Sequence, residues 1–257
     1  MYHIMKCILV TPVGRERYLS KLYKHIKRQK NEFDVWHLWM NTIIKEDIDY
    51  IESLAKSETW IKIIYKDLIK IIPDKGSSCR NLNLFYGDYR EPSVIYIKID
   101  DDIVFMETDF IKKLKDFRMS NRNNPIVFPN IINNNYFNDI HKHIKDIDKS
   151  LPEREYALQI HKVFKDNPMT DFYFDDIVLN DFKRVGIQCF SWIGNDFPKM
   201  FNKLCSDPMR HDDEQWLSFK FPLKVGVPNK VRGDCLCVHY SYNSQQICNE
   251  YKRLLDY

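Results

Sequence analysis

Residues 96–106 read YIKIDDDIVFM, so that three consecutive aspartates lie between two apolar runs. The preceding segment, residues 93–99, has isoleucine at every second position, which predicts a half-buried or wholly buried strand. An acidic triplet can be a solvated turn, but carboxylates wedged between apolar runs are costly unless a cation neutralises them. We therefore predict that the triplet binds Mg²⁺ or Mn²⁺, ions that prefer carboxylate oxygen and keep positions for phosphate.

Strands and helices alternate in the part of the chain that leads to the aspartates. Apolar periodicity predicts strands at 6–12, 33–41, 60–65 and 93–99, and helices at 15–29, 45–57 and 77–89. This alternation is typical of an α/β fold with a mostly parallel sheet. Ligands of such sheets bind at the carboxyl ends of the strands, which is where the aspartates lie.

The pattern is less regular after the aspartates. Residues 133–176 are polar, with only short helical stretches, which is typical of a functional loop region. Around this region we predict helices at 107–120, 212–222 and 245–257 and strands at 125–132, 185–194 and 235–242.

The composition excludes several classes of protein. The chain has 257 residues, of which 44% are hydrophobic and 29% charged, and its net charge is +3. No block of consecutive Lys and Arg residues of the kind that binds nucleic acid is present in the sequence. No signal peptide and no apolar run long enough for a transmembrane helix is visible. The seven cysteines show no redox or zinc spacing, so we expect them to be reduced in a soluble cytoplasmic protein.

Two chemistries place a D-x-D motif after an apolar strand. One is that of nucleotide-sugar glycosyltransferases, and the other is that of haloacid-dehalogenase-type phosphatases, whose D-x-D-x-[TV] motif is matched by residues 100–104. Such phosphatases normally carry the motif on the first strand and need a later acidic pair. Here the motif is on the fourth predicted strand, and Gly233-Asp234 lacks the second aspartate. The order of motifs therefore favours a glycosyltransferase.

The chain resembles glycosyltransferases of the GT-A fold, especially viral and bacterial members. The resemblance covers roughly residues 6 to 246 and implies one domain over 1–257, with a nucleotide-binding half at 1–102 and an acceptor-binding half at 103–257. The segments that carry it are ILVTPVGRERYLSKL (8–22), DKGSSCRNLNL (74–84), IYIKIDDDIVFM (95–106), FSWIGNDF (190–197), DDEQWLS (212–218) and GVPNKVRGDCLCVHYSYNSQ (226–245).

This resemblance implies how a donor nucleotide would be held. Thr11, Pro12 and Val13 would form a wall for the base, and Asn41 stands where many relatives have an aspartate that reads the base. A UDP-sugar is the favoured donor, although the sequence leaves the base, the sugar and the linkage open.

Charged residues would bind the rest of the donor. Arg15 would reach the nucleotide, although it is also explained as a solvated residue at a helix start. Arg80 would contact the diphosphate, although a salt bridge on a helix surface also explains it. Asp100 would hold the ribose, Asp102 would ligate the metal, and Asp101 would share either task. His239 is the further metal ligand that the resemblance implies, and because manganese accepts imidazole more readily than magnesium does, Mn²⁺ is the expected ion.

The acidic segment at 212–214 would supply the general base. Asp213 is the expected base, with Asp212 as the helix cap and Glu214 facing solvent, although either neighbour is an alternative. An inverting hexosyl- or pentosyltransferase acting on a glycan or protein-glycan acceptor is implied, in the host cytoplasm if the chain is viral. A non-catalytic nucleotide-sugar or glycan-binding protein is the main alternative. The residues expected to contact the acceptor are Trp192, Gly194 and Asn195.

Overall fold

The computed structural model describes residues 5–71 and 78–240. Within these ranges no helix is long and apolar enough to cross a membrane. The helix predicted at 245–257 lies outside the described residues, as do Ser77, at the start of the helix predicted at 77–89, and the last two residues of the strand predicted at 235–242.

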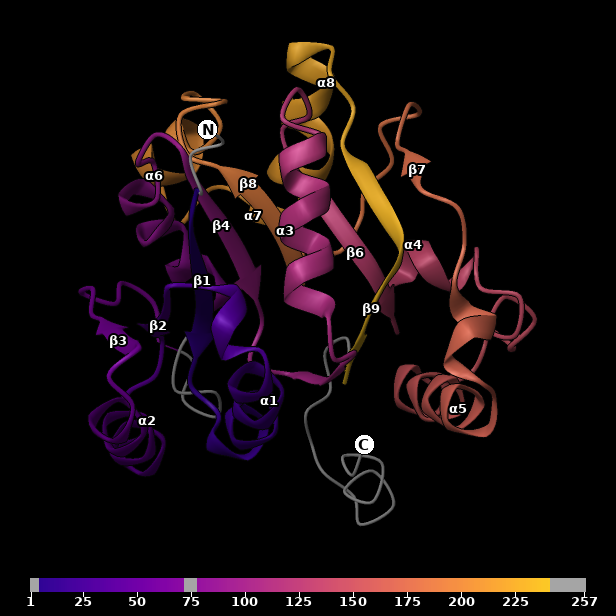
Figure 1. Ribbon diagram of the computed structural model, residues 1–257, viewed down its shortest axis with the longest axis horizontal. Helices are drawn as coiled ribbons and strands as arrows, with labels where there is room; N and C mark the ends of the chain where they lie inside the picture. The colour runs from indigo at the N-terminus through magenta and orange to yellow at the C-terminus, as the bar shows by residue number, and fades with distance from the viewer. Residues whose placement is uncertain (1–4, 72–77, 241–257) are drawn as a thin grey trace.

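The first half of the chain forms a parallel sheet, as predicted. Strands β1 (Lys6–Val13), β2 (Val35–Met40), β3 (Ile61–Ile64) and β4 (Val94–Ile99) run parallel in the order β3-β2-β1-β4. Helices α1 (Glu16–Arg28) and α2 (Lys45–Ser57) connect the first three strands (Figure 1). The apolar stripe of α1 explains its place against the sheet, because Leu19, Leu22 and Ile26 are fully buried.

The sheet continues beyond β4 with strands of mixed direction. Its other strands are β8 (Cys189–Ile193), β6 (Val127–Ile132), β9 (Lys230–His239) and β5 (Ile103–Met106), in that order, and β7 (Ile177–Val178) pairs with β9. β8 is antiparallel to β4 and to β6, whereas β6 and β9 are parallel. The structure thus confirms a Rossmann-like α/β fold with a mixed distal half.

Helices cover the distal half of the sheet. α3 (Phe110–Ser120) lies across β6 and β8 and beside β9, and α4 (Asn135–Asn138) follows β6 (Figure 1). α6 (Asn202–Ser206) contacts the 3₁₀ turns that precede β4. α7 (Asp213–Gln215), a π turn (Trp216–Lys220) and α8 (Phe221–Val225) follow one another without a break and confirm the helix predicted at 212–222.

The helix predicted at 77–89 is wrong in type. The described part forms two 3₁₀ turns, Cys79–Leu84 and Tyr86–Asp88, and the Ser78 hydroxyl caps the first by accepting from the Arg80 N–H. Two buried asparagines explain the difference. Asn81 accepts from the backbone N–H groups of Ile69 and Lys70, both at 3.1 Å, and the Asn83 amide donates to the carbonyls of Pro208 and His211 at 2.8 and 2.9 Å. These contacts join the turns to other segments.

The prediction of only short helices in 133–176 is also wrong. Helix α5 spans Glu153–Asp166, and its buried residues Ala157, Ile160, His161 and Phe164 have the spacing of one helical face. This face is hard to identify from the apolar pattern of the sequence, because one of its buried residues is a histidine. His161 is fully buried, and its Nε2 lies 2.6 Å from the Tyr240 carbonyl oxygen, which makes it a packing residue.

Candidate functional site

A cavity of about 500 Å³ lies at the carboxyl ends of β1, β2 and β4. Pro12, Val13 and Arg15 line it where β1 ends, and Asn41 does so where β2 ends. Sequence segments far apart in the chain therefore meet where open α/β sheets bind ligands. The other predicted residues that line the cavity are Arg80, Asp100, Asp101, Asp102, Asp212, Asp213, Glu214 and His239.

Arg15 binds two of the three aspartates. Its Nε lies 3.0 and 3.3 Å from the two carboxylate oxygens of Asp101, and a second guanidinium nitrogen also pairs with Asp101 and lies 3.2 Å from Asp102 Oδ2. The Gly14 N–H donates to Asp101 at 3.2 Å. Asp101 and Asp102 are only 2% and 5% exposed, so these contacts replace water around both carboxylates.

Lys98 binds the third aspartate. Its ammonium group pairs with Asp100 and donates to the Ile187 carbonyl at 2.9 Å, while its side chain is 1% exposed. The premise that only a bound cation can neutralise the triplet is therefore wrong, because Arg15 and Lys98 supply positive charge from within the chain. Nothing in the sequence marks Lys98 as a site residue, because it occupies an alternating position in an otherwise apolar strand.

Asp102 and His239 are neighbours, because Asp102 directly precedes β5 and His239 ends β9, the strand paired with β5. His239 Nε2 lies 3.5 Å from Asp102 Oδ2, and its Nδ1 lies 3.2 Å from the Asn133 carbonyl oxygen, to which it donates. Burial disfavours both charged forms. Nevertheless, Arg15 and His239 hold the pKa of Asp102 below its ordinary value, and Asp102 raises the pKa of His239.

These two side chains fit part of a metal site. Two neighbouring ligands of an octahedral ion lie about 3 Å apart, close to the separation of the facing Asp102 and His239 atoms. In the described residues no group of three or more His, Cys, Asp and Glu side chains is arranged to hold a metal. Asp102 and His239 alone would leave most positions of such an ion to water or substrate oxygen.

The acidic residues at 212–214 have three different environments. Asp212 caps α7 by accepting from the Gln215 N–H at 2.8 Å, as predicted. Glu214 does not simply face solvent, because it lines the cavity and pairs with Arg184 at 2.6 Å. Arg184 also lies 3.4 Å from Asp212. No signal in the sequence marked Arg184 as a cavity residue.

Asp213 is positioned by hydrogen bonds. The Tyr86 hydroxyl donates to its Oδ2 at 3.2 Å, and the Glu214 N–H donates to its Oδ1 at 3.0 Å. No ion pair of Asp213 is found in the described part of the chain. Burial raises its pKa, the nearby Lys98 charge lowers it, and Asp212 raises it again, with a net increase. A carboxylate with a raised pKa in a cavity is suited to accept a proton.

Four predicted site residues do not line the cavity. The Thr11 hydroxyl is buried and accepts from the Trp36 indole N–H at 2.8 Å. Trp192 is 1% exposed, donates to the Tyr89 carbonyl at 3.1 Å and stacks on Tyr96. The structure thus places Trp192 in the aromatic core, where a sugar cannot stack on it. The remaining two, Gly194 and Asn195, form the turn after β8, where Asn195 is exposed with a φ of 64°.

We expect Gly194→Ala to lower the free energy of unfolding by about 1–3 kcal/mol, the usual cost of overpacking. A Cβ at this position would lie 2.1 Å from the Glu91 carbonyl oxygen, so the backbone must shift. Urea unfolding of Gly87→Ala is the matched control, because that Cβ would meet only Cys205 Sγ at 3.4 Å. Equal stability of the two variants would contradict a packing role for Gly194.

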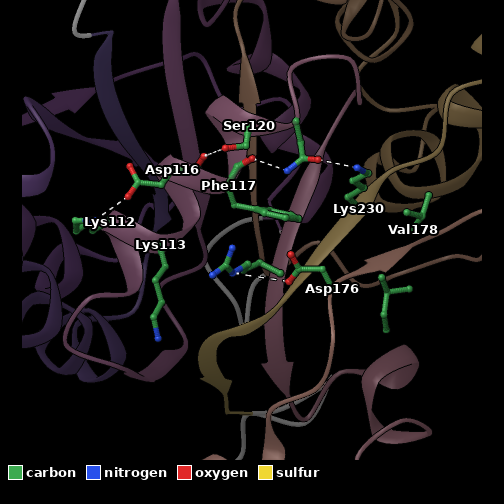
Figure 2. A pocket seen from close by; sticks show the side chains of 11 residues that line it. Lys112, Lys113, Asp116, Phe117, Ser120, Asp176, Val178 and Lys230 are labelled. Atoms are coloured by element: carbon green, nitrogen blue, oxygen red, sulfur yellow. Dashed lines mark hydrogen bonds and ion pairs between the residues drawn. The ribbon is translucent and has the colours of Figure 1, made fainter. Parts of the chain in front are cut away.

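A second cavity, of about 430 Å³, lies between α3, β7 and β9 (Figure 2). Its charged side chains already have partners: Lys112 pairs with Asp116 at 2.8 Å, and Lys230 donates to Asn121 at 2.7 Å. Asp176 lies 3.8 Å from Arg232, which also pairs with Asp234. This arrangement offers no base or nucleophile comparable to Asp213.

No protein-family model matches the chain, and no curated protein does. Among solved structures, it is similar to a 4-diphosphocytidyl-2C-methyl-D-erythritol synthase, with a TM-score of 0.48 and 11% identity over 98% of this chain and 100% of that one. It is also similar to a CMP:2-keto-3-deoxy-manno-octonic acid synthetase complexed with CTP, with a TM-score of 0.45 and 10% identity over 91% and 90% of the two chains.

Proposed function

We propose that this protein is a metal-dependent glycosyltransferase that moves a sugar from a nucleoside-diphosphate sugar, with UDP-sugars favoured, to a hydroxyl of a glycan or protein-glycan acceptor. The observation that supports this proposal is one cavity that contains both the D-x-D carboxylates and Asp213. Binding of an activated sugar and deprotonation of an acceptor can therefore take place side by side.

The end of the parallel sheet would bind the donor. Pro12, Val13 and Asn41 would line the base subsite, and Asp100 would hold the ribose. Asp102 and His239 would hold Mn²⁺, with Mg²⁺ as the alternative ion, and the bound ion would balance the charge of the diphosphate leaving group. Arg80 lines the same cavity and would pair with the diphosphate oxygens. Arg15 lines it too and would reach the nucleotide while it stays paired with Asp101 and Asp102.

Asp213 would act on the acceptor. As the acceptor hydroxyl oxygen attacks the anomeric carbon, its proton passes to the Asp213 carboxylate, and the electron pair of the breaking carbon–oxygen bond leaves with the diphosphate. A single displacement of this kind inverts the anomeric configuration. The hydrogen bonds from Tyr86 and from the Glu214 N–H fix the carboxylate for this step.

A thermal-shift screen tests the proposed function. UDP, UDP-sugars and CTP, the last as comparator, are each added with and without Mn²⁺. We expect UDP compounds to raise the melting temperature only with Mn²⁺, because a ligand of the native state stabilises it by mass action. Slow Mn²⁺-dependent hydrolysis of a UDP-sugar then distinguishes a transferase from a non-catalytic binder. Stabilisation by CTP alone, or hydrolysis of simple phosphomonoesters, would contradict the proposal.

A further inference from the structure

Five consecutive residues before β8 join the two sides of the cavity, and we call residues 184–188 the bridge segment. Its last two residues are bound to the end of β4. Lys98 donates to the Ile187 carbonyl at 2.9 Å. The Asp100 N–H donates to the Gln188 carbonyl at 2.8 Å. The bridge segment is therefore fixed to the strand that leads to the D-x-D aspartates.

The first residue of the bridge segment, Arg184, binds the start of α7. Its Nε donates to the Glu214 carboxylate at 2.6 Å, and its Nη2 donates to Asp212 Oδ2 at 3.4 Å. The other Asp212 oxygen accepts from the Gln215 N–H at 2.8 Å. A planar guanidinium group has several donors in a fixed geometry and can hold two carboxylates at once. One side chain thus binds the residues on both sides of Asp213.

The stability of the fold does not explain these ion pairs. The side chain of Arg184 is 50% exposed, and those of Asp212 and Glu214 are 36% and 30% exposed. Ion pairs as exposed as these contribute little to stability. The bridge segment is also bound nearby without any charge, because the Val185 N–H donates to the buried Ser218 hydroxyl at 3.2 Å. The effect of Arg184 is therefore local to the start of α7.

A change at Glu214 reaches the Asp213 carboxylate through one hydrogen bond. Asp213 Oδ1 accepts from the Glu214 N–H at 3.0 Å, and Asp213 Oδ2 accepts from the Tyr86 hydroxyl at 3.2 Å. The first of these donors belongs to a residue whose side chain Arg184 holds. If Glu214 moves, the Asp213 carboxylate loses one of its two fixed contacts and turns relative to the Tyr86 hydroxyl.

We propose that Arg184 is a positioning residue for Asp213. Its ion pairs with Asp212 and Glu214 fix the start of α7 to the bridge segment, and so hold the Asp213 carboxylate at a set place relative to the D-x-D aspartates. This inference rests on the proposed function for the role of Asp213 as the base. A base must lie within hydrogen-bond reach of the proton that it takes, so its placement affects the rate of transfer.

A double-mutant cycle tests the positioning without any ligand. Tyr86→Phe removes the hydroxyl that donates to Asp213 and keeps the buried ring. Arg184→Met removes the guanidinium group from a half-exposed position, so the protein should still fold. We expect Tyr86→Phe to lower the free energy of unfolding by less in Arg184→Met than in the wild type, because the hydrogen bond that it removes is already weakened. Equal losses in the two backgrounds would overturn the inference.

Lys183→Met is the matched control, because the Lys183 ammonium group pairs with Asp181 of its own loop at 2.8 Å. The loss caused by Tyr86→Phe should be the same in this background as in the wild type. A change as large as that in Arg184→Met would assign the effect to the loop in general and would also overturn the inference. Arg184→Lys keeps a cation that can pair with one carboxylate at a time, so it should restore part of the loss.

The same variants separate positioning from donor binding. We expect Arg184→Met to lower the rate of Mn²⁺-dependent hydrolysis of the UDP-sugar found by the thermal-shift screen by about 10–100-fold, since a displacement of about 1 Å can cost about 100-fold. The affinity for UDP with Mn²⁺ should stay nearly unchanged. A fall in UDP affinity as large as the fall in rate would make Arg184 a donor-binding residue and overturn the inference. If UDP does not bind the wild type, the proposed function is wrong, while the unfolding cycle still decides whether Arg184 positions Asp213.

Discussion

Asp213→Asn is expected to lower the rate of sugar transfer by about 10²–10⁴-fold, the usual contribution of a positioned general base. The asparagine keeps the size of the side chain and can still accept from Tyr86, whose hydroxyl lies 3.2 Å from Asp213 Oδ2. It cannot take the acceptor proton. The affinity for UDP with Mn²⁺ should stay nearly unchanged, because no described contact joins Asp213 to Asp102 or His239. Initial rates and titration calorimetry of the same preparation measure both quantities.

Two neighbours provide the controls for this experiment. Glu214→Gln should lose far less activity, because Glu214 is paired with Arg184. Asp212→Asn removes the charge of the capping residue but keeps an oxygen that accepts from the Gln215 N–H, so it should keep both fold and activity. A larger loss in Glu214→Gln or Asp212→Asn than in Asp213→Asn would assign the base to that neighbour. If the wild-type product retains the anomeric configuration, the mechanism in which a general base acts in a single displacement is excluded.

The pH dependence of transfer should reflect the same residue. The raised pKa of Asp213 places its protonation above 3.8, the ordinary value for an aspartate. Since a base acts only when deprotonated, the rate should fall as the pH falls through this raised pKa. The rate of transfer, measured against pH at saturating donor, should show this fall as an acidic limb. Its persistence in Glu214→Gln and its absence from the residual activity of Asp213→Asn would attribute it to Asp213.

Regular periodicity made the first half of the fold predictable. Strands β1 to β4 are short apolar runs separated by amphipathic helices, so each element shows its own pattern. The errors arose where tertiary contacts decide local structure. Asn81 and Asn83 bind other segments and give 3₁₀ turns in place of a helix, and the buried His161 made the apolar face of α5 look polar.

The site was predictable in its position but not in its electrostatics. Motif order indicated that the D-x-D strand, the acidic helix start and a late histidine would meet, and all three line one cavity. The ion pairs of Lys98 with Asp100 and of Arg15 with Asp101 depend on how β1, β4 and the segment before β8 come together. Likewise, Trp192 could be given a sugar-stacking role because a sequence does not show which aromatic residues of a strand the core covers.

Asp102→Asn is expected to remove the Mn²⁺ dependence of UDP binding. Asp102 Oδ2 is the oxygen that faces both Arg15, at 3.2 Å, and His239, at 3.5 Å. An amide there is a much weaker metal ligand than a carboxylate. We expect the affinity for UDP in the presence of Mn²⁺ to fall by at least about 10–100-fold, since changes in outer-shell partners alone cost this much. Calorimetric titrations with UDP, with and without Mn²⁺, measure the effect.

Asp101→Asn is the matched control, because Asp101 is bound by Arg15 and the Gly14 N–H and has no described contact with His239. It should keep the Mn²⁺ dependence. His239→Ala should lose it, as Asp102→Asn does, and melting temperatures without ligand show whether each variant is folded. If a folded Asp102→Asn protein still binds UDP more tightly with Mn²⁺ than without it, Asp102 is not a metal ligand. Arg15 and Lys98 are then the cations that balance the carboxylates.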